Sequence, residues 1–436
     1  MATLSVGLSQ VDITPPLGTE LCGFGPYLER RSEKVLEPLS ARTCLFKLGR
    51  TTLALVSLDL VGIRLAHTRA IRKRVTRSTG IPGKNVMLCC THSHSGPATG
   101  AYRAWGEPNP AYLRKLPGLV ARGIIEANER FRPATLSYAE ATLKGLAVNR
   151  VSDPKYVDDR LVVLRIDSDS ETVAFLAHSS IHPVVLASES RNLCGDFVGL
   201  AINAVARDFP GSVGLYVQGA CGDINVADAC RPLPEAMKAL QRHSRALAGA
   251  IRRALNKATP LRVDRLKATL RAITLPQVRT PAAEAFMMYA EGARMAGVND
   301  QRIRRWGRFL RDAYAEIFRK IKRGDRPGLR TELQGFAIGR LLILAQPSEL
   351  YFTFYERLRR TLRGRKLIFA GYTNDTVGYV PDRKAFEITS VVTPPFGTYA
   401  PYMVPIIRCD YRFREDVGDV LFDRVVGLSK TLTRKG

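Results

Sequence analysis

Apolar runs that end abruptly in polar or glycine-rich stretches recur along the whole chain. Continuous apolar runs of this length are typical of buried strands. We predict strands over residues 3–8, 41–48, 52–63, 86–90, 134–142, 160–167, 172–178, 213–218, 335–346 and 367–370. Apolar residues at helical spacing predict helices over 65–79, 110–130, 197–208, 233–257, 281–296, 301–323 and 350–363, with a last one at the end of 405–434.

The order of these elements predicts an α/β fold. Helix 65–79 joins strand 52–63 to strand 86–90, and such a unit pairs its two strands in parallel with a right-handed crossover. We therefore expect mixed central sheets flanked by helices, with the functional site at the carboxyl ends of the strands. We predict a single domain, 1–436, with a helical insertion at about 278–326.

Two acidic residues have an ordinary structural interpretation at helix starts. Asp196 is placed to cap helix 197–208. Ser348 is placed to cap helix 350–363, which makes Glu349 an acid of its first turn. Asp59, inside strand 52–63, fits either a partner for a backbone amide or an acid supporting a site.

Composition limits the class of protein. With 436 residues, 45% hydrophobic and 24% charged, the chain is typical of a globular protein. Its formal net charge of +26 favours anionic partners such as acidic substrates or lipid, although a generally arginine-rich surface is the simpler explanation. No zinc-finger or RNA-binding signature is present, so we expect no nucleic-acid partner.

Cysteine spacing and the N-terminal segment bear on location. The eight cysteines are scattered without a CxxC pair, which fits reduced thiols (residues 22, 44, 89, 90, 194, 221, 230 and 409). The N-terminal segment lacks a basic region followed by an apolar core, and no apolar run is long enough to span a membrane. We therefore expect a soluble, cytoplasmic protein.

Helix 301–323 is strongly basic on its polar face. It carries nine Lys/Arg against two Asp/Glu, a net charge of +7. A helix of this kind is suited to peripheral contact with an anionic membrane. The favoured alternative is a surface helix that packs its apolar stripe on the body of the protein.

The stretch from Asn85 to Thr99, NVMLCCTHSHSGPAT, is the most suggestive for chemistry. His92 and His94 follow a buried strand and are two residues apart, so in extended backbone both imidazoles point to the same side. Two imidazoles at the mouth of a sheet form half of a common zinc site. A hydrogen-bonded histidine pair without metal is the alternative.

Four further strands end in loops that carry ligand-type residues. They supply His182 before Pro183, Asp223 with Asn225, Glu349, and Tyr379 in a Gly- and Asn-rich loop. Catalytic zinc takes three or four nitrogen and oxygen ligands and keeps one position open for water. The shared placement of these residues just after strands is a stronger indication than any one of them alone.

The order of these motifs resembles the catalytic N-terminal domain of the neutral/alkaline non-lysosomal ceramidase family. The matching motifs are DITPP, THSHSGP, Asn149-Arg150, IHP followed by GDFVG, QGACGD, PSE and TNDTVGYVP. The family's enzymes are zinc amidases that cleave the amide bond of ceramide. The resemblance implies one catalytic domain that binds one Zn²⁺.

The resemblance also implies roles for individual residues. His92, His182, Glu349 and Tyr379 would bind zinc, and His94 would be the acid/base. Arg150 would contact the substrate or, together with Tyr379, its oxyanion.

Two features depart from the family's ceramidases. Asn225 stands where they carry a serine, and an amide cannot act as a nucleophile although it can hydrogen-bond a substrate. The chain also ends where they continue into a C-terminal β-sandwich, so we expect no such domain here.

We therefore predict a ceramidase-like, zinc-dependent amidohydrolase whose substrate is not ceramide. Metal-activated water would attack the carbonyl carbon of a small-molecule amide. An ester or lactone would suit the same site. The alternative from another class is a non-catalytic protein that keeps the fold and binds anionic lipid or another polyanion through its basic surface.

Overall fold

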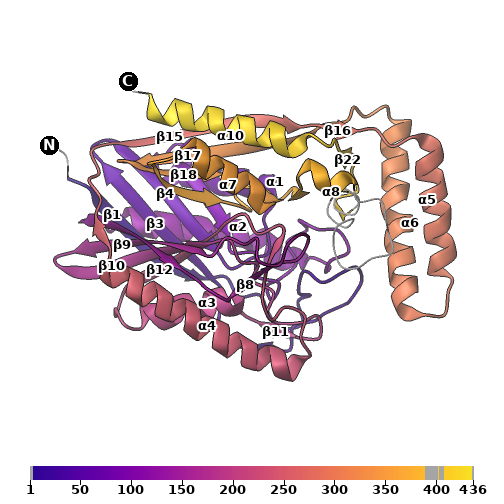
Figure 1. Cartoon of the computed structure of the whole chain (residues 1–436), viewed down its shortest axis with the longest axis horizontal. Helices are drawn as coiled ribbons and strands as arrows, with labels where there is room; N and C mark the ends of the chain where they lie inside the picture. Colours follow the sequence, from indigo (N-terminus) through magenta and orange to yellow (C-terminus); the bar gives the residue numbers. More distant parts are fainter. Residues whose placement is uncertain (1–2, 388–400, 402–406, 435–436) are drawn as a thin grey trace.

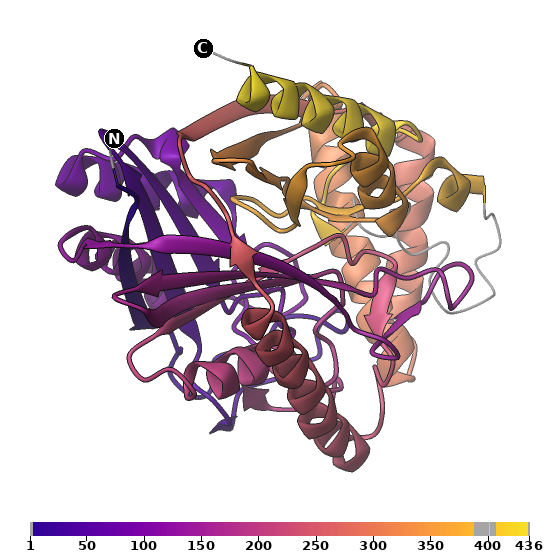
Figure 2. The ribbon, with the colours of Figure 1, turned by 60° about the vertical axis from the view of Figure 1, so that its left-hand side comes forward.

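Three β-sheets, each covered by helices, make up the molecule (Figures 1 and 2). The computed structural model describes residues 3–387, 401 and 407–434. The first sheet has the order β5 (Val86–Cys90), β4 (Thr51–Leu58), β3 (Ser40–Leu48), β1 (Ser5–Asp12) and β6 (Arg132–Pro133). β4 and β5 are parallel, as predicted from the helix between them, and the other pairs are antiparallel.

The second and third sheets are also mixed. The second has the order β12 (Val213–Gln218), β10 (Glu171–Ser179), β9 (Arg160–Ser168), β7 (Thr135–Thr142) and β14 (Thr259–Pro260). The third has the order β15 (Leu266–Leu275), β17 (Leu329–Ile338), β18 (Leu341–Ala345) and β20 (Lys366–Ala370). β10 runs parallel to β12, and β18 runs parallel to β20.

Helices cover the outer face of each sheet, and apolar clusters lie both between the sheets and between each sheet and its helices. α1 (Leu65–Thr79) and α2 (Pro110–Asn128) pack together beside the first sheet. α3 (Asp196–Ala206) and α4 (Leu233–Asn256) pack together beside the second, and α7 (Phe352–Thr361) and α10 (Val417–Thr433) beside the third. A single cluster joins buried side chains of all three sheets, including Leu55, Leu176 and Ile343. The predicted α/β class with mixed sheets flanked by helices is thus confirmed.

Short elements complete the chain. They are the 3₁₀ turn η1 (Gly83–Asn85), α8 (Arg383–Glu387), and the small strands β2 (Lys34–Val35), β8 (Ala147–Asn149), β11 (Asn192–Leu193), β13 (Ile224–Val226), β16 (Gln277–Val278), β19 (Ser348–Leu350), β21 (Gly378–Val380) and β22 (Arg412–Phe413). In the described part of the chain, no helix is both long and apolar enough to cross a membrane.

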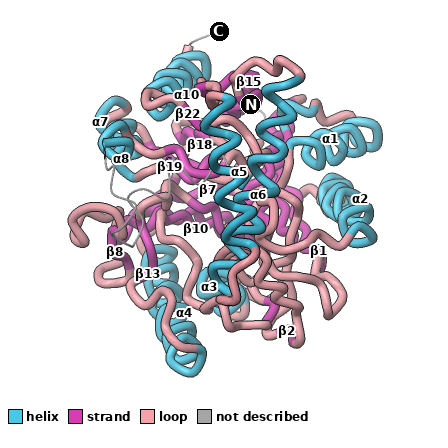
Figure 3. Tube along the Cα trace, turned by 90° about the vertical axis from the view of Figure 1, so that its right-hand side faces the viewer, coloured by secondary structure: helices cyan, strands magenta, loops and turns pink. Residues whose placement is uncertain are grey.

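A helical hairpin stands at one end of the molecule (Figures 1 and 3). It consists of α5 (Ala282–Ala296) and α6 (Gln301–Lys322), which fall within the segment predicted as a helical insertion. α6 buries Phe309, Ala313 and Ile317, so its apolar stripe packs against the body of the protein. This confirms the interpretation that the sequence favoured.

Two strand predictions were wrong because a buried loop or turn can be as apolar as a strand. β4 ends at Leu58, and the apolar residues up to Ile63 form a buried loop with 0–1% exposure. The predicted strand 335–346 is part of a hairpin, β17 and β18, that turns at Gly339 with φ of +57°. A run of apolar residues on both sides of Gly339 concealed that turn.

The two predicted caps were also wrong. Gly195 precedes α3, and the buried Asp196 carboxylate accepts hydrogen bonds from the backbone of Val185 and Leu186, at 3.3 and 3.2 Å. Tyr351 precedes α7, so Ser348 and Glu349 lie in the strand β19 and not in a helix turn.

Candidate active site

His92 and His94 meet at the end of β5. The backbone N–H of His92 donates to Leu60 at 2.9 Å, and His92 takes a left-handed conformation with φ of +67°. The two imidazoles nevertheless converge, with 3.1 Å between their Nε2 atoms. Their convergence therefore comes from this local twist and not from the extended backbone that the two-residue spacing suggested.

The ring of His92 is held in one orientation. Its Nδ1 lies 2.5 Å from the carbonyl oxygen of Val61, so Nδ1 carries the proton and donates it there. The ring of Tyr372 stacks on it with centroids 3.8 Å apart. The lone pair of Nε2 is consequently left facing the other histidine rings.

His182 reaches the same point from the second sheet. Its backbone N–H donates to Ile224 at 3.0 Å, and it forms a parallel bridge with Asn225. Its Nε2 lies 3.2 Å from Nε2 of His94. The parallel pairing of β10 with β12 explains the bridge between His182 and Asn225, because parallel neighbours end at the same edge of a sheet.

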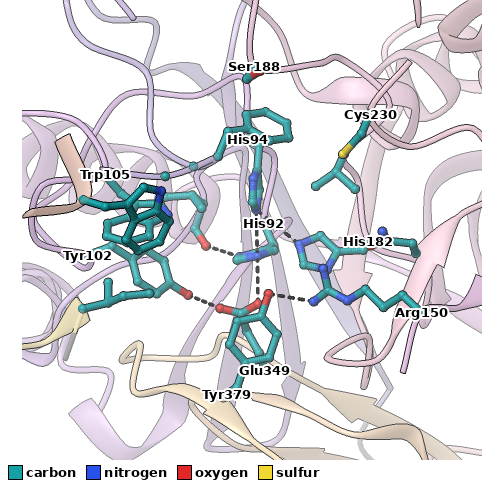
Figure 4. A pocket seen from close by; sticks show the side chains of 18 residues that line it. His92, His94, Tyr102, Trp105, Arg150, His182, Ser188, Cys230, Glu349 and Tyr379 are labelled. Atoms are coloured by element: carbon teal, nitrogen blue, oxygen red, sulfur yellow. Dashed lines mark hydrogen bonds and ion pairs between the residues drawn. The ribbon is translucent and has the colours of Figure 1, made fainter. Parts of the chain in front are cut away.

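Glu349 and Tyr379 come as a pair from the small two-stranded sheet of β19 and β21, whose strands follow β18 and β20 of the third sheet in the chain. β19 and β21 are parallel, with Glu349 directly opposite Tyr379. The Oε2 atom of Glu349 lies 3.5 Å from Nε2 of His92. The hydroxyl of Tyr102 donates to the other carboxylate oxygen at 2.5 Å (Figure 4).

Arg150 lies on the opposite side of the carboxylate from Tyr102 (Figure 4). β8 and β13 pair just before it, and its backbone N–H donates to Asp223 at 2.9 Å. Its Nη2 donates to the hydroxyl of Tyr379 and to the carbonyl of Gly222, both at 2.7 Å. These two contacts hold the guanidinium beside the histidine cluster.

Asn225 and Asp223 have different surroundings. The side chain of Asn225 lines the cavity, and its Oδ1 is buried without a hydrogen-bond partner among the described residues. The carboxylate of Asp223 accepts from the backbone of Phe352 at 2.7 Å and from the side chain of Asn149 at 2.9 Å. Asp223 therefore holds its loop against the start of α7 and the end of β8, and burial raises its pKa to about 6.

Burial sets the protonation states of the cluster. Desolvation, with added repulsion from His92 and Arg150, lowers the pKa of His94 and of His182 well below the ordinary value. Burial alone would raise the pKa of Glu349, but His92 and hydrogen bonds from Tyr102 and Tyr379 outweigh it and lower that pKa. Neutral His94 and His182 beside an ionised carboxylate are in the forms that bind a metal ion.

The cluster lies in a cavity of about 360 Å³ (Figure 4). This volume is at the lower end of the range for small-molecule sites. Apolar side chains form much of its wall, namely Phe24, Val61, Trp105, Val184, Trp306 and Ile407. Trp306 belongs to α6, so the helical hairpin contributes directly to the wall of the cavity.

Comparison with known proteins places this site in a family. The family model described as neutral/alkaline non-lysosomal ceramidase, N-terminal, matches residues 4–224. The chain belongs to the neutral/alkaline non-lysosomal ceramidase family. Of the residues at the site, His92, His94, Arg150 and His182 lie within the matched half, whereas Asn225, Glu349 and Tyr379 follow it.

Two solved ceramidase structures share the fold. Neutral ceramidase from Pseudomonas aeruginosa superposes with a TM-score of 0.77 at 19% identity, over 100% of this chain and 76% of that one. A ceramidase complexed with C2 gives a TM-score of 0.74 at 18% identity, over 100% and 77% of the two chains. No curated protein matches at the sequence level.

The geometry of this ceramidase-family site fits a metal ion. Nε2 or Nδ1 atoms of His92, His94 and His182 all lie within 4.8 Å of one another. Two ligands about 2.05 Å from a tetrahedral zinc ion would be about 3.3 Å apart. The separations of 3.1, 3.2 and 3.5 Å among the three imidazoles and Glu349 are close to that value. The three histidines can therefore hold a metal. The sequence predicted His92 and His182 among the ligands and gave His94 the acid/base role.

Several residues of the site were missed from sequence. Tyr102 and Trp105 follow THSHSGP within eleven residues of His94, and aromatic residues so close to a candidate ligand were a usable signal. Tyr372 and Trp306 gave no such signal, because only the fold brings them to the cavity. Asp59 is not part of the site, since its carboxylate pairs with buried Arg42 at 2.6 Å.

The glycine loop near the N-terminus, which contains Gly23 and Gly25, has a clear packing role. A Cβ on Gly23 would lie 2.3 Å from Nδ1 of His94, and Gly23 has φ of +102°. Only glycine therefore lets His94 keep its position.

We expect Gly23→Ala to reduce turnover at least tenfold by displacing His94, while metal content is retained. The matched control is Gly25→Ala, which has a similar φ of +120° but no atom within 4 Å of its added Cβ. Both variants carry backbone strain of about 1–3 kcal/mol, so thermal unfolding should shift alike. Equal turnover in the two variants would contradict the proposed importance of His94 placement.

Proposed function

We propose that this ceramidase-family protein is a metal-dependent hydrolase of a carbon–nitrogen amide bond. The observation that carries the proposal is the convergence of three buried imidazoles with Glu349 at one point in an apolar cavity. Zinc suits this nitrogen and oxygen donor set best, at one ion per chain. His92, His182, Glu349 and Tyr379 are the proposed ligands, and a bound ion would supply Lewis acidity and lower the pKa of water.

The chain's own residues would perform the remaining steps. His94 faces the cavity, and its imidazole is neutral because burial lowers its pKa. Its Nε2 can therefore accept a proton from water and return it to the leaving nitrogen. Arg150, held by Gly222 and Tyr379, can stabilise negative charge that develops on the carbonyl oxygen. The apolar wall excludes water from the reacting bond, which strengthens these interactions.

The eight cysteines support action in a reducing compartment such as the cytoplasm. All eight are free thiols, and seven of them are buried. Disulfides are rare where glutathione and thioredoxin keep thiols reduced.

Metal analysis tests the proposed function directly. The purified chain should contain about one zinc per molecule, and a chelator should remove both the metal and hydrolysis of amide substrates. Loss of the ion should also lower the unfolding temperature, because binding stabilises the folded state. A chain that holds no metal and unfolds identically with and without chelator would overturn the proposal.

The substrate is proposed to be an amide other than ceramide, and an ester or lactone would suit the same residues. The reason is Asn225, whose Oδ1 is buried at the cavity without a partner in the described part of the chain and can accept a hydrogen bond from a ligand. A serine there, as in the family's ceramidases, would offer a shorter hydroxyl that both donates and accepts and that can act as a nucleophile, which an amide cannot.

We expect Asn225→Ser to raise the ratio of ceramide hydrolysis to hydrolysis of the preferred substrate by at least tenfold. The measurement is kcat/KM for both substrates in the two proteins. Asn225→Ala is the control, because it removes the amide without adding a hydroxyl. An unchanged ratio in Asn225→Ser would show that this loop does not set the substrate.

A further inference from the structure

Large apolar side chains are exposed mainly in one region of the molecule. Among the described residues, those with high exposure are Leu17, Val35, Val278, Phe286, Met287, Tyr289 and Ile303. Five of these seven lie between residues 278 and 303, on or next to the α5–α6 hairpin. Phe286 and Met287 are the most exposed, at 61% and 63%.

These side chains form a continuous stripe on the outer face of α5. Its exposed positions recur at helical spacing and are apolar except for Arg294; they are Ala282, Ala283, Phe286, Met287, Tyr289, Ala290 and Ala293. We call this set the α5 face. Figure 1 shows α5 as the outermost helix at its end of the molecule, with α6 between it and the body.

The hairpin presents this face as a rigid unit. α5 and α6 pack so closely that a Cβ on Gly292 would lie 2.4 Å from the backbone of Arg311, and one on Gly307 would lie 2.3 Å from that of Ala296. α6 in turn buries Phe309 and Ile317 against the body. The exposed apolar residues are thus held outward on a supported helix.

Charge at the connection between the two helices is positive. Arg302 and Arg304 are exposed there without an ion pair to a described acid, against one exposed acid, Asp300, which caps α6. The two acids of α5 are both neutralised, Glu291 by Arg294 and Glu284 by Arg412. An anionic surface would therefore meet cations and apolar side chains on the hairpin, with little opposing negative charge.

We propose that the α5 face docks on an anionic lipid surface. Aromatic and aliphatic side chains flanked by arginine are the combination that binds the boundary between headgroups and acyl chains. Each arginine near such a surface adds attraction that weakens as salt is added. The same hairpin contributes Trp306 to the cavity wall, so docking would bring the cavity beside the lipid layer. The docking residues belong to α5, whereas the sequence pointed to helix 301–323.

Vesicle binding by the full chain tests this proposal without requiring catalysis. The wild-type protein should co-sediment with vesicles of phosphatidylglycerol and phosphatidylcholine at least tenfold more tightly than with phosphatidylcholine alone. The double variant Phe286→Asp/Met287→Asp should lose at least tenfold in affinity, and Arg302→Gln/Arg304→Gln should lose the salt dependence. Leu17→Asp, at a 56% exposed leucine outside the hairpin, is the matched control and should bind as wild type.

A second copy of the chain is the alternative occupant of the α5 face, and it would give a different result. A wild-type protein that dimerises without vesicles, and a double variant that is monomeric, would show that a second copy of the chain covers the α5 face. Equal vesicle binding by wild type and the double variant would also overturn the proposal. Metal content, measured alongside, reports separately on the hydrolase function and should be unchanged in all these variants.

Discussion

His182→Ala should yield a folded protein without metal and without hydrolase activity. The substitution removes the donor that the second sheet brings to the cluster, 3.2 Å from His94. Because Lewis acidity and the activated water disappear together, we expect activity to fall by about 10⁴-fold or more. Metal content by mass spectrometry and kcat/KM on an amide substrate are the measurements.

The chain offers a matched control for this variant. His178 lies on β10, four residues before His182, and is equally buried, but it bonds to Val217 and Tyr355. His178→Gln should keep both metal and activity, even if the protein becomes less stable. A His182→Ala protein that retains its full metal content would remove His182 from the proposed ligand set.

His94→Ala should separate metal binding from turnover. We expect it to keep the metal and to lose about 10²- to 10⁴-fold in kcat, the range for removal of a general acid/base. His92 donates Nδ1–H to Val61, as metal-ligating histidines do, whereas Nδ1 of His94 and Nδ1 of His182 are both buried without a partner in the part of the chain described. The ring contacts therefore support His92 as a ligand, and the division of roles between His94 and His182 rests on the family resemblance.

The competing arrangement is a three-histidine site. Nε2 of His94 is as close to His92 as a co-ligand would be, at 3.1 Å. If His94→Ala loses the metal as completely as His182→Ala does, then His94 is a ligand and the proton transfer must be assigned elsewhere.

The helices and strands were predicted well where the spacing of apolar residues along a short segment determines the structure. Helix 65–79 has the predicted bounds in the structure and ends at Gly80, which takes φ of +73°. Strand 86–90 is likewise confirmed. The errors occurred in segments that are apolar because they are buried, although they are not strands. Examples are the loop 59–63 and the turn at Gly339.

The sequence predicted only some of the residues that come together at the site. Ligand-type residues after strands identified His92, His182, Glu349 and Tyr379 as candidates, and the fold brings all four to one cavity. The partners that orient them were not visible, since Tyr372 and Trp306 approach through contacts between distant segments. The register between strands also determines which residues face each other. One example is the direct pairing of Glu349 with Tyr379, which the sequence did not predict.

The origin of the ligands in three separate sheets has a consequence for folding. His92 and Glu349 are far apart in sequence, and a site built from such distant segments forms only after the slow, non-local contacts are made. The proposed ion would then bind the fully assembled chain in preference to partly folded forms. Metal occupancy would report whether a molecule has completed folding, and metal supply would set the fraction of chains that survive cellular quality control.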